Sequence, residues 1–160
     1  NEEDCHDVLG IKAGDTDVHS GKLDTSRYPD VARQVVKQFP NVSKVAITLR
    51  ESYSASHNNW GAMLYDAKSD TPFFAPLDLK GNYQSYEIKN IVDRVGGGDS
   101  FAGGLIFALT TTELSEPQTA VKYAVAASCL KHTIKGDANL ATKEEVEKLM
   151  GGDSSGRVAR

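Results

Sequence analysis

The sequence is poor in the residues that mark several common protein classes. Its 160 residues include two cysteines, Cys5 and Cys129, and one tryptophan. Two cysteines without Cys-x-x-Cys spacing give neither a disulfide framework nor a cysteine-based zinc site. We expect two free thiols, with a single disulfide as the lesser alternative. None of the four histidines has a helical metal-binding partner at i, i+4.

Positive charge and long apolar runs are also scarce. The formal net charge is −4 and the pI is near 5.5, which argues against a general nucleic-acid binder. No apolar run approaches the roughly 18 residues that a membrane span needs. The first residues, Asn-Glu-Glu-Asp, do not resemble a signal peptide. We therefore expect a cytoplasmic protein with neither nucleic-acid nor membrane partners.

The most informative segment joins a β-type run, residues 86–92, to an apolar helical run, residues 101–109. Three consecutive glycines at 96–98 lie between them and allow close backbone approach to a ligand. Successive N–H groups at a helix N-terminus bind anions, and Asp99 beside them can accept a proton from a hydroxyl. The pattern favours phosphoryl transfer. A tight turn with Asp99 as a helix N-cap is the alternative, and spacing alone does not separate the two.

Hydrophobic periodicity predicts an α/β domain. The expected helices span residues 2–9, 26–39, 101–109, about 115–132 and 142–150, and the expected strands span 42–49, 60–65, 71–75 and 86–92. The Val and Ile content of 42–49 suits a parallel sheet, and 60–65 with 71–75 suits a hairpin. We expect one layered domain over residues 1–150, a loop over 11–25, and a flexible tail over 151–160.

These motifs resemble the ribokinase-type carbohydrate kinases. Asp93-Arg-Val-Gly-Gly-Gly-Asp99-Ser-Phe-Ala-Gly-Gly104 is similar to their second signature. Asn1-Glu-Glu-Asp4 is similar to their Asn-x-x-Glu motif, and Val45-Ala-Ile-Thr48-Leu49 to the strand before their nucleotide loop. The resemblance implies an ATP-dependent kinase for a small sugar or sugar acid. It also implies the C-terminal, nucleotide-binding part of a ribokinase-like (Rossmann-like) layered α/β domain.

Chains of that family are roughly twice as long as this one, which fits a larger α/β domain. The first residue is not Met, so we expect an N-terminal half that grips the sugar to precede this chain. The full-length parent is expected to bind sugar acid and ATP, and the resemblance leaves open whether that parent is a monomer or a homo-oligomer.

The resemblance also assigns roles to individual residues. Asp99 would be the general base and would contact the sugar hydroxyl, and Gly98 would be the least replaceable glycine. The remaining assignments are an anion hole at Gly96, Gly97 and Gly98; a K⁺ site beside Asp93; a Mg²⁺ water shell at Asn1 and Asp4; a nucleotide loop with Thr48, Arg50 and Ser52; and adenine contacts at Val125 and Ser128, near Asn139.

Simpler structural roles stand beside several of these assignments. Asn1 and Asp4 also suit a plain helix cap. Arg94, where the family has Thr, could face a phosphate or lie free on the surface.

Two functional alternatives remain. Gly98-Asp99-Ser100-Phe101 resembles an esterase block, but no histidine follows His132 to complete such a site. The chain could also bind nucleotide without catalysis, because the sugar-binding half of the resembling kinases is absent from it.

Overall fold

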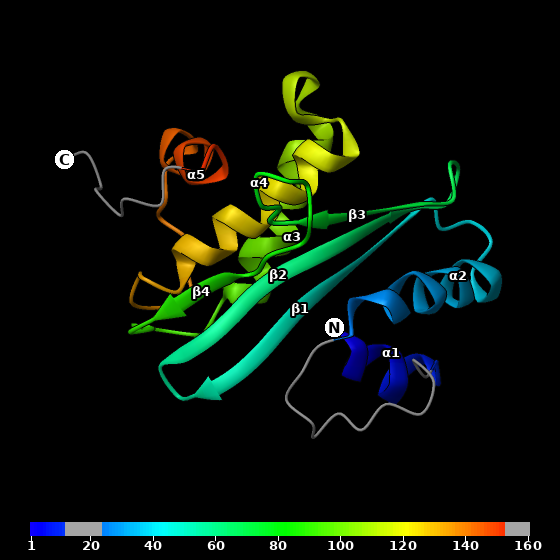
Figure 1. Cartoon of the computed structure of the whole chain (residues 1–160), viewed down its shortest axis with the longest axis horizontal. Helices are drawn as coiled ribbons and strands as arrows, with labels where there is room; N and C mark the ends of the chain where they lie inside the picture. The colour runs from blue at the N-terminus through cyan, green and yellow to red at the C-terminus, as the bar shows by residue number, and fades with distance from the viewer. Residues whose placement is uncertain (12–23, 153–160) are drawn as a thin grey trace.

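The computed structural model describes residues 1–11 and 24–152. Most of the predicted loop over 11–25 and of the predicted tail over 151–160 lies outside the described residues. Figure 1 shows a sheet with helices on both faces. In chain order the elements are α1 (Glu2–Leu9), the short 3-10 helix η2 (Thr25–Arg27), α2 (Tyr28–Gln38), β1 (Lys44–Ser54), β2 (His57–Asp66), β3 (Thr71–Ala75), β4 (Tyr86–Lys89), α3 (Gly97–Thr110), η3 (Thr112–Leu114), α4 (Pro117–Lys131) and α5 (Lys143–Met150).

The four strands form one antiparallel sheet, so the predicted parallel arrangement of 42–49 is wrong. β1 pairs with β2 along its whole length, while β3 and β4 pair with different parts of the other edge of β2. The reason is the connection between β1 and β2, which is too short for the crossover that a parallel pair requires. The predicted hairpin of β2 and β3 is confirmed.

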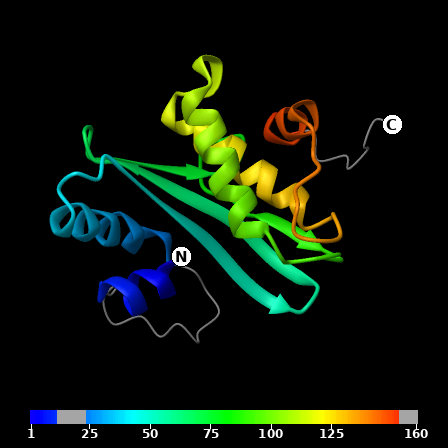
Figure 2. The same ribbon diagram turned by 180° about the vertical axis from the view of Figure 1, so that it is seen from behind.

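Two hydrophobic cores lie on opposite faces of the sheet. α1 and α2 pack on one face, against Val45, Ile47 and Leu49 of β1. α3, α4 and α5 pack on the other face, over Trp60, Leu64 and their neighbours. The views from both sides show the same division (Figures 1 and 2). The layered α/β architecture predicted from the sequence is therefore confirmed.

The interior of the second layer is α4 rather than α3. Most of the middle of α4 is buried, which its many alanines allow because small side chains let α3 and the sheet approach closely. α3 is apolar in sequence, yet Ile106 and Phe107 are exposed on it. Gly104 of α3 lies over Ala124 and Ala127 of α4, so the two helices cross at a contact of small residues.

Helix ends follow the local sequence. Thr142 and Glu145 form a capping box at the start of α5. At α4 the side chain of Glu116 caps the helix by accepting from the N–H of Thr119. Among the described residues, no helix is both long enough and apolar enough to cross a bilayer.

The packing of β2 against β3 generates a stability prediction at Gly61. A methyl group there would meet the backbone oxygen of Ala75 at 2.8 Å and the ring of Tyr83. Gly61→Ala is expected to lower the free energy of unfolding by about 1–3 kcal/mol through overpacking. In the control, Gly103→Ala in α3, the added methyl meets nothing, so up to about 1 kcal/mol of stabilisation is expected. Urea unfolding measures both, and equal values would contradict the packing shown.

Candidate active site at the start of α3

A left-handed turn at Gly96 starts α3. Gly96 is the N-cap, with φ of 79° and ψ of 2°. Its α-carbon faces Asp137, whose carbonyl occupies the space that a side chain at 96 would need. Residues other than glycine rarely adopt this backbone conformation. Gly96 therefore allows both the positive φ of the turn and the close approach of Asp137, and the direction of α3 depends on it.

Packing makes Gly96 rather than Gly98 the glycine that the fold requires, and the expectation that Gly98 is the least replaceable for phosphate binding stays a prediction. Gly98 has ordinary helical geometry, and a side chain there would meet no atom within 4 Å. Gly97 is intermediate, since a methyl group would lie 3.3 Å from Cε1 of His132. The sequence motif shows three equal glycines, but only the structure shows that Asp137 lies against the first.

The first turn of α3 presents backbone N–H groups. The first helical bond runs from the N–H of Ser100 to the carbonyl of Gly96 at 2.8 Å, so the N–H groups at 97–99 precede it. The N–H of Gly97 donates to the carbonyl of Arg94 at 3.3 Å. The predicted anion hole is therefore narrower than the motif indicates and centres on the N–H groups of Gly98 and Asp99.

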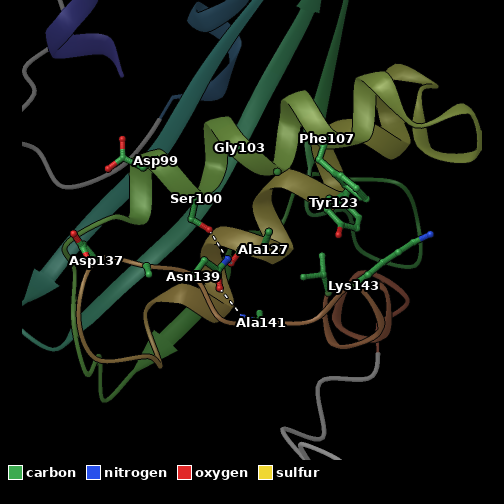
Figure 3. A pocket seen from close by; sticks show the side chains of 13 residues that line it. Asp99, Ser100, Gly103, Phe107, Tyr123, Ala127, Asp137, Asn139, Ala141 and Lys143 are labelled. Atoms are coloured by element: carbon green, nitrogen blue, oxygen red, sulfur yellow. Dashed lines mark hydrogen bonds between the residues drawn. The ribbon is translucent and has the colours of Figure 1, made fainter.

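Asp99 is in the third position of α3 rather than at its cap, so its alternative role as N-cap is wrong. The side chain is exposed. Figure 3 shows its carboxylate pointing outward, away from the place where Ser100 and Asn139 meet. A carboxylate at this position faces solvent beside the helix N-terminus, which suits a group that must reach a hydroxyl on a bound molecule.

Asp93 fastens the turn to the segment after α4. Its Oδ1 accepts from the N–H of Val95 at 3.0 Å, and its Oδ2 accepts from the N–H of Gly136 at 2.9 Å. These bonds lower the pKa of Asp93 below its ordinary value, and the positive charge of Lys131 adds to the effect. Asp93 is thus a structural bridge between two loops and not a freely solvated carboxylate.

Arg94 neither faces the helix N-terminus nor lies free on the surface. Its guanidinium donates to the carbonyls of Ser54 and Ala55 in the turn between β1 and β2, and to Oδ1 of Asn58. The predicted free surface position of Arg94 is therefore wrong, and a contact with phosphate stays a prediction. The guanidinium instead joins the glycine turn to the sheet. Its planar set of N–H donors can bind several acceptors at once.

The ring of His132 packs against Gly97 of the turn, a position that no sequence motif indicates. Its side chain is buried, its Nδ1 bonds to the carbonyl of Ser128 at 2.7 Å, and its ring packs edge-on against Trp60. Its carbonyl accepts from the N–H of Val92 at 2.8 Å. Burial lowers the pKa of His132, which favours the neutral ring. Its position near a helix end in the sequence had suggested a surface role.

The structure buries the two residues predicted to contact adenine. Val125 and Ser128 are both 0% exposed. The hydroxyl of Ser128 accepts from Nε1 of Trp60 at 2.7 Å and donates to the carbonyl of Val125. Both side chains lie on the buried part of α4, so neither can contact a ligand in this structure. Helical periodicity could not show this, because α4 is apolar on most of its faces.

A cavity of about 540 Å³ opens beside Asp99, between α3, α4 and the segment before α5. Figure 3 shows Ser100 and Asn139 meeting at its centre, with Phe107 and Tyr123 at one end. Nδ2 of Asn139 donates to the Ser100 hydroxyl at 2.6 Å and to the carbonyl of Ala127 at 3.0 Å. Asn139 was predicted near the site and lies in this cavity.

The residues of the predicted nucleotide loop form part of a strand. Thr48, Arg50 and Ser52 all lie within β1, paired with Ala62, Trp60 and Asn58 of β2. The polar run from 50 to 59 lies outside the predicted strands, but it extends the hairpin of β1 and β2. Its side chains are held by contacts across the strands, such as the bond from Asn59 to the Glu51 carboxylate at 2.7 Å. A nucleotide role for these residues stays a prediction.

The predicted Mg²⁺ residues form a helix cap. The N–H of Asp4 donates to the side chain of Asn1 at 2.9 Å, and the two make a capping box on α1. No group of three or more His, Cys, Asp or Glu side chains in the described ranges could hold a metal. A Mg²⁺ ion held mainly by phosphates and water needs no such group, so the Mg²⁺ assignment stays a prediction.

The turn geometry predicts effects of different size on stability at Gly96 and Gly98. Gly96→Ala places a methyl group against the Asp137 backbone at positive φ, and it should cost about 2 kcal/mol or more of unfolding free energy. Gly98→Ala in open space should change stability by no more than about 1 kcal/mol. Chemical unfolding of both variants tests this, and a greater loss for Gly98→Ala would refute the arrangement.

The bonds of Asp93 predict a pH-dependent effect. Its folded pKa lies below the unfolded value of about 3.9, so the stability it contributes is present above that pH and is lost as pH falls through the folded pKa. Asp93→Asn should therefore be less stable than wild type at neutral pH, with a gap that closes below about pH 4. Urea unfolding across this range measures the gap, with exposed Glu113→Gln as control. A gap that does not depend on pH would contradict this.

Comparisons with known proteins find similarity to carbohydrate kinases. No protein-family model matches the chain. The solved structure of 2-dehydro-3-deoxygluconokinase from Thermotoga maritima is similar at 41% identity and a TM-score of 0.77, over 95% of this chain and 40% of that one. A PfkB family carbohydrate kinase from Listeria grayi is similar at 26% identity and a TM-score of 0.70, over 94% of this chain and 39% of that one.

A sequence relative points the same way. The 2-dehydro-3-deoxygalactonokinase of Haloferax volcanii is 38% identical over 65 residues, which are 41% of this chain and 20% of the relative. The chain thus spans well under half the length of the proteins it matches. Together the matches confirm the resemblance that the motifs indicated: in sequence and fold, the chain is similar to about two-fifths of a ribokinase-type carbohydrate kinase.

Proposed function

We propose that this chain supplies the phosphoryl-transfer part of an ATP-dependent sugar-acid kinase. The proposed reaction phosphorylates 2-keto-3-deoxygluconate on its 6-hydroxyl. The observation that carries the proposal is the start of α3, where an exposed carboxylate, Asp99, adjoins N–H groups that precede the first helical bond. The choice of this sugar acid is supported by the similarity to the 2-dehydro-3-deoxygluconokinase of Thermotoga maritima, and the Haloferax volcanii relative is a 2-dehydro-3-deoxygalactonokinase.

In the proposed reaction Asp99 accepts the proton of the sugar hydroxyl. The hydroxyl oxygen forms a bond to the γ-phosphorus of ATP as the bond from that phosphorus to ADP breaks. The N–H groups of Gly98 and Asp99 would donate to the phosphoryl oxygens, on which negative charge is spread. Mg²⁺, when bound, would neutralise charge on the phosphates. Asn1 and Asp4 would approach it only through water, because their side chains cap α1.

A second function, nucleotide binding without catalysis, is favoured by one observation. The chain spans about 40% of the Thermotoga maritima kinase, so the surface that grips the sugar acid lies outside it under the proposed function. The two functions agree on where phosphate binds and differ only in whether Asp99 has a hydroxyl to act on.

The proposal predicts that binding and turnover depend on different side chains. Calorimetric titration of the chain with Mg-ATP should give binding that Asp99→Asn spares. Gly98→Val should abolish that binding while the chain stays folded, since a side chain there meets no protein atom but covers the first turn. In a full-length kinase that contains this chain, Asp99→Asn should lower kcat by about 10²–10⁴-fold.

Three outcomes separate the functions. Loss of turnover in Asp99→Asn with binding retained supports the kinase. Mg-ATP binding by the chain, with no sugar-acid phosphorylation in the full-length protein, supports the binding function. A folded chain that takes up no Mg-ATP, together with normal kcat in full-length Asp99→Asn, would overturn the kinase proposal.

A further inference from the structure

Lys131, the last residue of α4, is a buried lysine that no predicted role includes. Its side chain is 0% exposed. Its Nζ donates to the carbonyl of Ile134 at 3.0 Å, so the side chain contacts the turn that follows the helix. Burying an ammonium group is costly unless negative groups surround it. The position of Lys131 therefore calls for a compensating environment.

Three negative features provide that environment. The C-terminal end of a helix carries partial negative charge, and Lys131 ends α4. The carbonyl of Ile134 accepts directly from the ammonium group. The carboxylate of Asp93 feels the charge of Lys131, which contributes to the lowered pKa of Asp93. The helix end and the carbonyl of Ile134 are the groups that meet the ammonium directly, and they would otherwise attract a free cation.

The same segment holds the turn at the start of α3. The N–H of Gly136 donates to Asp93, and the carbonyl of His132 accepts from the N–H of Val92. Asp137, the next residue after Gly136, provides the backbone against which Gly96 packs. Residues 131–137 therefore hold the glycine turn through these contacts, and Lys131 is the first residue of this segment.

We infer that the ammonium group of Lys131 serves as a built-in cation that fixes the 131–137 segment behind the glycine turn, in place of a bound monovalent ion. The inference rests on the proposed function, because it names a positioning residue for the phosphate site at the start of α3. Under this inference K⁺ is not needed at Asp93, where the resemblance implied it. Both Asp93 oxygens accept backbone N–H groups, and a second cation would meet the charge of Lys131.

The wild-type chain provides the first test. Amide hydrogen exchange at Val95 and Gly136, whose N–H groups donate to Asp93, reports on the two loops without any nucleotide. Exchange is expected to be the same in choline chloride as in potassium chloride at equal ionic strength, because the cation is covalently attached. Exchange that potassium slows specifically would overturn the inference, and this comparison needs no variant.

Three variants provide the second test. Lys131→Met keeps the side-chain volume but removes the charge, and should speed exchange at both amides about tenfold or more in either salt. Lys131→Ala also opens space, so potassium chloride should restore protection that choline chloride does not. Lys135→Met removes an exposed charge four residues away and is the matched control. Folded Lys131→Met with wild-type exchange would overturn the inference.

Potassium rescue of Lys131→Ala separates a charge role from mere packing, because a lost packing contact does not respond to the identity of the salt. The test is also independent of the proposed function. If the wild-type chain fails to bind Mg-ATP in either salt, the nucleotide proposal fails while the exchange data still decide the role of Lys131. If Mg-ATP binds, its affinity should follow the exchange pattern across the three variants.

Discussion

The contact between Gly96 and the backbone of Asp137 is the constraint on which the candidate site depends. Because the Asp137 carbonyl fills the space of a side chain, residue 96 must be glycine, and its positive φ sets the direction of α3. That direction leaves the carboxylate of Asp99 exposed beside N–H groups that no helical bond uses. Position, charge and donors at the site thus follow from one close approach of two loops.

Polar side chains, some half-buried and some buried, keep that approach in place. Asp93 joins the two loops, Arg94 joins the turn to the hairpin of β1 and β2, and the ring of His132 packs below Gly97. Trp60 and Ser128 continue the network into the sheet. Where such polar groups are buried they favour one arrangement, because each loses more when unpaired than it gains when paired. The site therefore depends on two distant parts of the chain, the turn after β1 and the segment after α4.

Local patterns predicted elements well and pairing poorly. The capping box at Thr142 follows from neighbouring residues, and the predicted span of α1 is confirmed. The direction of β2 relative to β1 depends on the short turn between Ser54 and His57. That turn lies within a polar run without an alternating apolar pattern, so the sequence did not show that the two strands are antiparallel. At the site, the motif located Asp99 and the glycine turn. It could not show that Val125 and Ser128 are buried, that Arg94 faces the hairpin, or that Lys131 is enclosed, since each depends on a distant segment.

The central claim is that the start of α3 binds phosphate. A crystal structure of the chain with Mg²⁺ and a non-hydrolysable ATP analogue tests it most directly. The account predicts a terminal phosphate within hydrogen-bond distance of the N–H groups of Gly98 and Asp99, with the Asp99 carboxylate beside it and Gly96 still against Asp137. A nucleotide bound with its phosphates elsewhere on the chain would contradict the account.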